Sequence, residues 1–105
     1  MTDFQIILCT CADRKQADLI AHRLVELQLA ACVNILPGLQ SIYRWQGSVE
    51  STAEVLLLIK TSSAHCREVQ STIQSLHSYE IPEFLVLPVS GGSDSYLAWL
   101  TASLR

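Results

Sequence analysis

Two thiols near the start of this chain are the groups best suited to hold a soft metal ion. Cys9 and Cys11 are separated by one residue within a short apolar run. On a β-strand their side chains would therefore point to the same side. Two sulfur atoms on one face suit a soft cation such as Cu(I). A buried cysteine is more often a small hydrophobic residue, and this alternative stays open for both thiols.

A histidine with carboxylates nearby in sequence offers a second set of candidate ligands. His77 follows an apolar helical stripe and precedes a loop that contains Tyr79, Glu80 and Glu83. Imidazole and carboxylate groups together can bind a divalent ion. The pattern equally fits a protonated histidine at the negative end of a helix. The two glutamates could also do acid–base chemistry, but no nucleophile or cofactor motif accompanies them, so we do not predict an enzyme.

Composition predicts one domain, residues 1–105, with one hydrophobic core. Half of the residues are hydrophobic and 16% are charged, which excludes a disordered chain. The net charge is −3 and the seven lysines and arginines are scattered, so we expect no nucleic-acid partner. No apolar run reaches the roughly 20 residues that cross a bilayer, and the start lacks a basic region. We therefore expect no membrane partner, a cytoplasmic location and four reduced cysteines.

The elements that must position these groups begin with a strand and a helix. The apolar, β-branched run at 4–11 is typical of a buried strand. Residues 14–30 have the apolar spacing of an amphipathic helix. Asp13 is placed to cap this helix, and Gln16 completes the pattern of a capping box.

A long hairpin follows. Its first arm is a strand at 32–36 that resumes at 39–45, and the interruption at Pro37-Gly38 predicts an edge strand or a bulge. Residues 46–48 form a tight turn, and the second arm runs over 49–60.

The second half of the chain predicts helix, loop, strand and helix. Ser62 or Ser63 can cap a helix whose apolar stripe ends before the loop at 77–82. A strand at 84–89 precedes a last short helix capped by Ser93 or Asp94. The order β-α-β-β-α-β-α predicts an α+β fold of the split β-α-β, ferredoxin-like type, with the last helix as an addition.

The hairpin is too long for a domain of this size. A second arm of about a dozen residues reaches roughly 40 Å at about 3.3 Å per residue. A compact domain of this length is only roughly 30 Å across. The hairpin should therefore project, with Ile42, Tyr43, Trp45 and Val49 outside the core. Bare strands and exposed aromatic residues favour pairing with other copies, so we predict a symmetric homo-oligomer. The alternative is a hairpin that curls back onto its own domain.

Five segments that together span nearly the whole chain carry recognisable motifs: Leu29–Asn34, Ser41–Gly47, Leu58–Thr61, His77–Glu83 and Tyr96–Leu100. In this order they resemble the CutA family of divalent-cation tolerance proteins. The resemblance implies a ferredoxin-like subunit, a homotrimer, a cytoplasmic setting and a role in tolerance of copper and other divalent metals, with no established reaction.

The resemblance also implies ligands for copper. In similar bacterial members, a cysteine on the first strand and a pair of histidines before a Pro-x-Tyr loop are associated with copper. Here the cysteine is Cys9 and the second histidine is His77, but Leu76 takes the place of the first histidine and Ser78 that of the proline. One candidate ligand is thus missing, and Cys11 could replace it as a soft donor.

Other positions shared with the family are expected around clefts between subunits, with structural roles favoured over binding. One alternative function is a small-molecule-binding signalling trimer like the P-II proteins, with its ligand between subunits near Glu83, Lys60 and the hairpin base. A second alternative is a scaffold that anchors another protein. The shared positions include Tyr43, Trp45, Tyr79, Glu80, Glu83 and Trp99.

Overall fold

A computed structural model describes residues 2–105 as a four-stranded antiparallel sheet with three α-helices. The strand order is β2-β3-β1-β4, and β1 pairs with both β3 and β4. No helix among the described residues is long and apolar enough to cross a membrane. The elements are β1 (Phe4–Cys11), α1 (Arg14–Glu26), β2 (Cys32–Trp45), β3 (Ser48–Ser62), α2 (Cys66–Leu76), β4 (Leu85–Pro88) and α3 (Asp94–Ser103).

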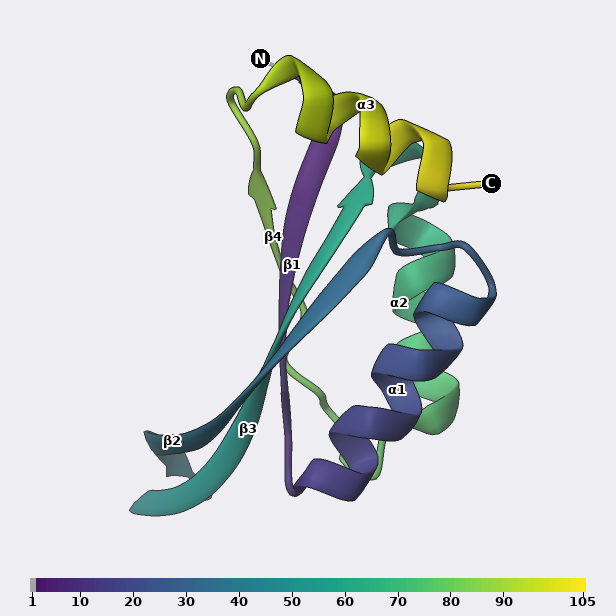
Figure 1. Cartoon of the computed structure of the whole chain (residues 1–105). Coiled ribbons are helices and arrows are strands. Elements are labelled where there is room, and N and C mark those ends of the chain that lie inside the picture. The colour runs from purple at the N-terminus through teal and green to yellow at the C-terminus, as the bar shows by residue number, and fades with distance from the viewer. Residues whose placement is uncertain (1) are drawn as a thin grey trace.

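The helices α1 and α2 cover one face of the sheet, and α3 lies across one end of it (Figure 1). Element order and strand order together confirm the predicted ferredoxin-like α+β fold with an additional C-terminal helix. The opposite face of the sheet has no helix over it in Figure 1. One chain therefore buries one side of its sheet and leaves the other side open.

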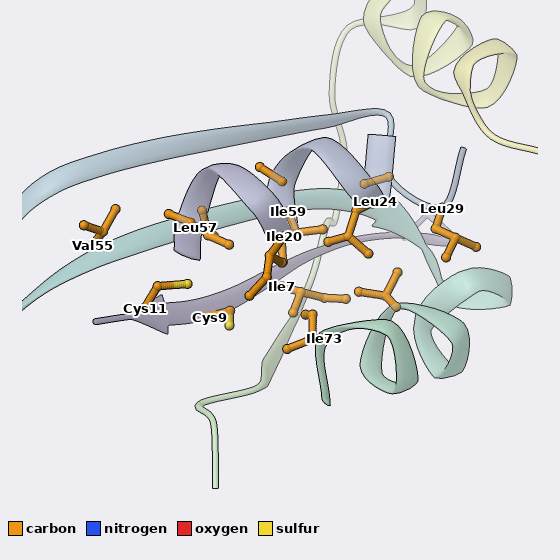
Figure 2. Packing of buried hydrophobic residues seen from close by; sticks show 14 residues of the cluster. Ile7, Cys9, Cys11, Ile20, Leu24, Leu29, Val55, Leu57, Ile59 and Ile73 are labelled. Carbon is orange, nitrogen blue, oxygen red and sulfur yellow. The ribbon is translucent and has the colours of Figure 1, made fainter. Parts of the chain in front are cut away.

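The core forms where the helices meet the centre of the sheet. Side chains of a strand alternate between faces, so Ile7, Cys9 and Cys11 of β1 all point toward the helices and are fully buried. Figure 2 shows the two cysteines in the same cluster as Ile20 of α1 and Ile73 of α2. The two thiols therefore stand at the sheet–helix interface and not on the open face.

The hairpin of β2 and β3 projects beyond the rest of the subunit (Figure 1). The molecule measures 45 × 25 × 23 Å, and Ile42 and Val49 near the hairpin end are 73% and 67% exposed. The turn consists of Gln46 and Gly47, both with positive φ (49° and 84°), as a two-residue type I′ turn requires. A bulge follows Leu36, as predicted from Pro37-Gly38. The alternative of a hairpin curled back on its domain is wrong.

The first helix ends earlier than predicted. Asp13 caps it as expected, since its side chain accepts a hydrogen bond from the Gln16 N–H. The helix stops at Glu26 instead of residue 30, because Gln28 adopts a positive φ of 58°. That turn allows Leu29 to be buried in the core.

The second helix also begins differently. Strand β3 continues to Ser62, and a 3-10 turn, Ser63–His65, precedes α2. The Ser62 hydroxyl pairs with Nδ1 of His65 at 2.7 Å and does not cap the backbone. Ser93 does cap α3, through a bond from the Tyr96 N–H.

A buried hydroxyl gives a test of this arrangement. Thr61 is fully buried and donates to the carbonyl oxygen of Leu29 at 2.6 Å, which fastens the segment after α1 to β3. Thr61→Val should lower the free energy of unfolding by about 1–3 kcal/mol, because the buried carbonyl loses this partner. Urea denaturation measures the loss.

Thr101→Val is the matched control. Its hydroxyl donates to the Leu97 carbonyl from an exposed residue, where water can replace it. We expect a change within about 0.5 kcal/mol. Equal losses in the two variants would contradict a special role for the buried bond.

Candidate metal centre

Three potential metal ligands meet at the core: two from β1 and one from the distant end of α2. The Cys9 sulfur, the Cys11 sulfur and a ring nitrogen of His77 all lie within 4.8 Å of one another. Strand alternation aligns the two cysteines, and the end of α2 delivers the histidine. Both thiols are fully buried and His77 is half-buried. The site is thus assembled by the sheet–helix contact itself.

The two thiols are close neighbours, and the Cys9 S–H donates to the Thr10 carbonyl oxygen at 3.9 Å. The pKa of Cys9 is strongly raised, first by the neighbouring Cys11 side chain and then by burial. The pKa of Cys11 is lowered by the neighbouring Cys9 side chain. The pair of thiols therefore loses its first proton more readily than its second. A cation that bound both sulfurs would have to displace that second proton.

The His77 ring is held at both nitrogen atoms. Its Nδ1 accepts the Tyr79 backbone N–H at 3.0 Å, so Nδ1 carries no proton. The neutral ring therefore has its proton on Nε2, which donates to the carbonyl oxygen of Thr10 at 2.8 Å. Thr10 lies between the two cysteines. The ring is consequently fixed beside the thiols, and one of its two bonds must open before a nitrogen can bind a metal.

The loop after His77 is tied to the hairpin by acidic residues. The Tyr79 hydroxyl donates to a carboxylate oxygen of Glu54 on β3 at 2.7 Å. Burial and this bond both raise the pKa of Tyr79. Burial, and then the Glu54 charge, raise the pKa of Glu83. Negative charge from Glu54 and Glu83 also contributes to the raised pKa of Cys9, so the acidic groups and the thiols occupy one neighbourhood.

Gln16 does not close the capping box that its spacing predicts. Its side-chain nitrogen donates to the carbonyl oxygen of Leu76 at 3.1 Å, and its side-chain oxygen accepts the Ser78 N–H at 2.6 Å. The reciprocal half of the box is therefore replaced by a bridge from α1 to the two residues that flank His77.

The remaining predicted site residues do not belong to the cluster of three donors. Glu80 is exposed on the loop. Tyr43 and Trp45 lie on the projecting hairpin, 42% and 50% exposed. At the other end of β3, the Lys60 ammonium lies 5.9 Å from the centre of the Tyr96 ring, which contacts the half-exposed Trp99.

Three residues near the site escaped the sequence reasoning. Glu54 was visible as the acidic residue that opens an apolar strand run, a weak signal for a polar contact. Gln16 had the spacing of a helix cap, and this pattern gave no sign of its hydrogen bonds to Leu76 and Ser78. Thr10 contributes its backbone carbonyl, and no side-chain pattern could have revealed it.

The donor chemistry fits a soft or borderline cation. Two sulfurs and an imidazole suit Cu(I) or Zn²⁺, whereas Mg²⁺ and Ca²⁺ prefer oxygen. Leu76 cannot be a ligand, and it packs against the hydrophobic core. Cys11 reaches the position from which it could supply the missing third donor.

Comparison with known proteins places the chain in a family. The model of the CutA1 divalent ion tolerance protein family matches residues 5–103. The Divalent-cation tolerance protein CutA of Pectobacterium atrosepticum is 47% identical over 105 residues, covering 100% of this chain and 96% of the relative.

Solved structures agree with the sequence comparison. CutA from Xylella fastidiosa superposes with a TM-score of 0.96 at 41% identity, covering 99% of this chain and 100% of the other. The divalent cation tolerance protein Cut A1 from Thermus thermophilus superposes with a TM-score of 0.95 at 43% identity, covering 97% of this chain and 99% of the other. The chain therefore belongs to the CutA1 divalent ion tolerance protein family.

Proposed function

We propose that this protein contributes to divalent-cation tolerance by binding copper, as Cu(I), through Cys9, Cys11 and His77. The observation that carries the proposal is the meeting of two sulfurs and one imidazole nitrogen within 4.8 Å. Zn²⁺ is the competing cation for the same donors. The role is binding and not catalysis, in keeping with relatives whose names describe tolerance. The free cysteines fit a reducing, cytoplasmic setting.

Ligand softness favours Cu(I) among the oxidation states of copper. Thiolates are soft ligands that select Cu(I). With both thiols deprotonated and a neutral imidazole, the Cu(I) complex would carry one net negative charge.

Metal binding is favoured over a P-II-like binding of small molecules. A surface hollow at the hairpin base has a volume of about 230 Å³ and is lined by Ala12, Glu54 and residues 38–40 among others. A P-II-like ligand would lie between subunits, whereas the three metal donors already meet within one chain.

We also propose that the protein acts as a homotrimer. The sheet face without helices carries Leu85 and Leu87, 55% and 46% exposed, and the hairpin exposes Trp45. Large exposed apolar patches on a soluble chain indicate an interaction site. A symmetric assembly would cover the open face and the hairpin of every copy at once.

The metal proposal predicts one tight Cu(I) site per chain. We expect Cys9→Ala and Cys11→Ala each to weaken Cu(I) binding by about 100-fold or more. Even the loss of a residue that only orients a metal ligand typically lowers metal affinity by about 10–100-fold. His77→Gln should weaken it as well. Titration under anaerobic conditions against a Cu(I)-binding competitor measures the affinity.

Cys66→Ala provides the matched control. Cys66 is a free cysteine on α2 outside the three-donor cluster, so its removal should leave the affinity unchanged. Loss of one site on Cys66→Ala, or an unchanged affinity in both Cys9→Ala and Cys11→Ala, would refute the proposed ligands.

The assembly proposal predicts that the hairpin end is part of an interface. Trp45→Asp should shift the protein from trimer toward smaller species, because a buried aromatic contact is replaced by a charge without a partner. Sedimentation equilibrium measures the mass, and circular dichroism should show the secondary structure retained.

Leu19→Asp is the control, because Leu19 is 47% exposed on α1 and so resembles Trp45 in exposure. It lies on the helical layer, away from the open sheet face, and should remain trimeric. A trimer undisturbed by Trp45→Asp would exclude the hairpin end from the interface.

A further inference from the structure

We propose that Gln16 is the positioning residue of His77: it fixes the backbone on both sides of that histidine and so sets the place of the imidazole beside the thiols. The importance of this role rests on the proposed metal binding. The supporting geometry is specific, since one side-chain amide donates to Leu76 and accepts from Ser78, the two neighbours of His77 in sequence.

The end of α2 needs such a partner. The last carbonyl groups of a helix have no partner within the helix, and a glycine with positive φ commonly resolves this. Here α2 ends at Leu76, and His77 is extended, with φ −74° and ψ 141°. The chain therefore leaves the helix abruptly at His77. Gln16 satisfies the Leu76 carbonyl and the Ser78 N–H together, which defines the direction in which His77 leaves the helix.

Gln16 is itself held rigidly. Its backbone N–H donates to the Asp13 side chain at 2.9 Å in the first turn of α1. That turn is fixed to the core by Ala17 and Ile20, both fully buried. Figure 1 shows the start of α1 directly after the end of β1, the strand that carries the thiols. Gln16 thus relates His77 to the same strand end that places Cys11.

The bridge matters more for position than for stability. Its bond to Ser78 is exposed and its bond to Leu76 is half-buried, so water can replace either when the side chain is lost. His77, by contrast, must keep its ring beside Thr10 and the thiols. When Gln16 is lost, the ring bonds to Thr10 and Tyr79 and the backbone bond from the His77 N–H to the Ile73 carbonyl remain. Ring position should therefore degrade before the fold does.

Two variants of similar size separate the two halves of the bridge. Gln16→Met keeps the length but removes both hydrogen bonds. Gln16→Glu keeps an acceptor for Ser78 and places an oxygen against the Leu76 carbonyl. The control is Gln74→Met, at an exposed glutamine on α2. Circular dichroism and urea denaturation check that each variant is folded before the readouts below are compared.

The first readout needs no metal. In ¹⁵N-labelled protein, nitrogen NMR of the His77 ring should show one tautomer, with the proton on Nε2, in the unsubstituted protein and in Gln74→Met. Gln16→Met should shift the ring signals toward the averaged tautomers of a free histidine, with Gln16→Glu between them. A purely structural Gln16 would leave these signals unchanged.

The second readout is the affinity for Cu(I) by competitor titration. Gln16→Met should weaken binding by about tenfold, the lower end of the effect of residues that orient ligands. Gln74→Met should not. If Gln16→Met leaves both the ring signals and the affinity unchanged while the unsubstituted protein binds Cu(I), the positioning role is overturned and the metal site stands.

The opposite failure is also recognisable. If the unsubstituted protein binds no Cu(I), the proposed function fails, and the ring signals alone decide on Gln16. Averaged signals in Gln16→Met then support the positioning role, and an unchanged single tautomer overturns it. Equal effects of Gln16→Met and Gln74→Met would also overturn it, because they would reflect a general loosening of the α2 layer.

Discussion

The hydrogen bond between the His77 ring and the Thr10 carbonyl is the contact on which the candidate centre depends. Thr10 pairs with Leu56 of β3, and it lies beyond Leu8, where the pairing of β1 with β4 ends. The β1–β3 pairing therefore holds this part of the strand in place. The bond spans 67 positions of sequence and brings an imidazole to a strand that carries two sulfurs. Without it, the thiols would be two ordinary core residues.

The two faces of the sheet differ in what covers them. Toward the helices it forms a dry layer that buries Ile7, Leu57 and Ile59 together with the thiols (Figure 2). Away from the helices it is apolar but open, and the hairpin adds further apolar surface beyond the domain. The candidate metal centre thus lies on the face that a single chain completes, while the other face carries the features that favour association.

Elements with strong local patterns could be predicted from the sequence. The bounds of β1 are as predicted, because a short β-branched run between a polar start and Asp13 allows few alternatives. The long hairpin followed from length alone. The end of α1 could not be placed, because Gln28 adopts a positive φ that tertiary packing of Leu29 imposes and that glutamine does not favour by itself.

The three donors of the candidate site could be proposed from the sequence, but their geometry could not. Cys9, Cys11 and His77 were recognisable as donors, yet no sequence pattern reports that residues this far apart converge. That convergence depends on how α2 crosses the sheet and on the path of the loop after it. For the same reason Glu54 and Gln16 remained hidden: their partners lie 25 and about 60 positions away along the chain.

The complete burial of both sulfurs would slow metal binding, metal release and thiol oxidation. A hydrated ion or an oxidant in bulk solvent has no direct path to Cys9 or Cys11. Metal loading of the proposed site would require a transient opening of the segment around His77, and motions of this kind take microseconds to seconds. Exchange would then be slow compared with diffusion, and a captured ion would be retained long after the surrounding concentration had fallen. The same barrier protects the sulfur atoms from oxidation between encounters.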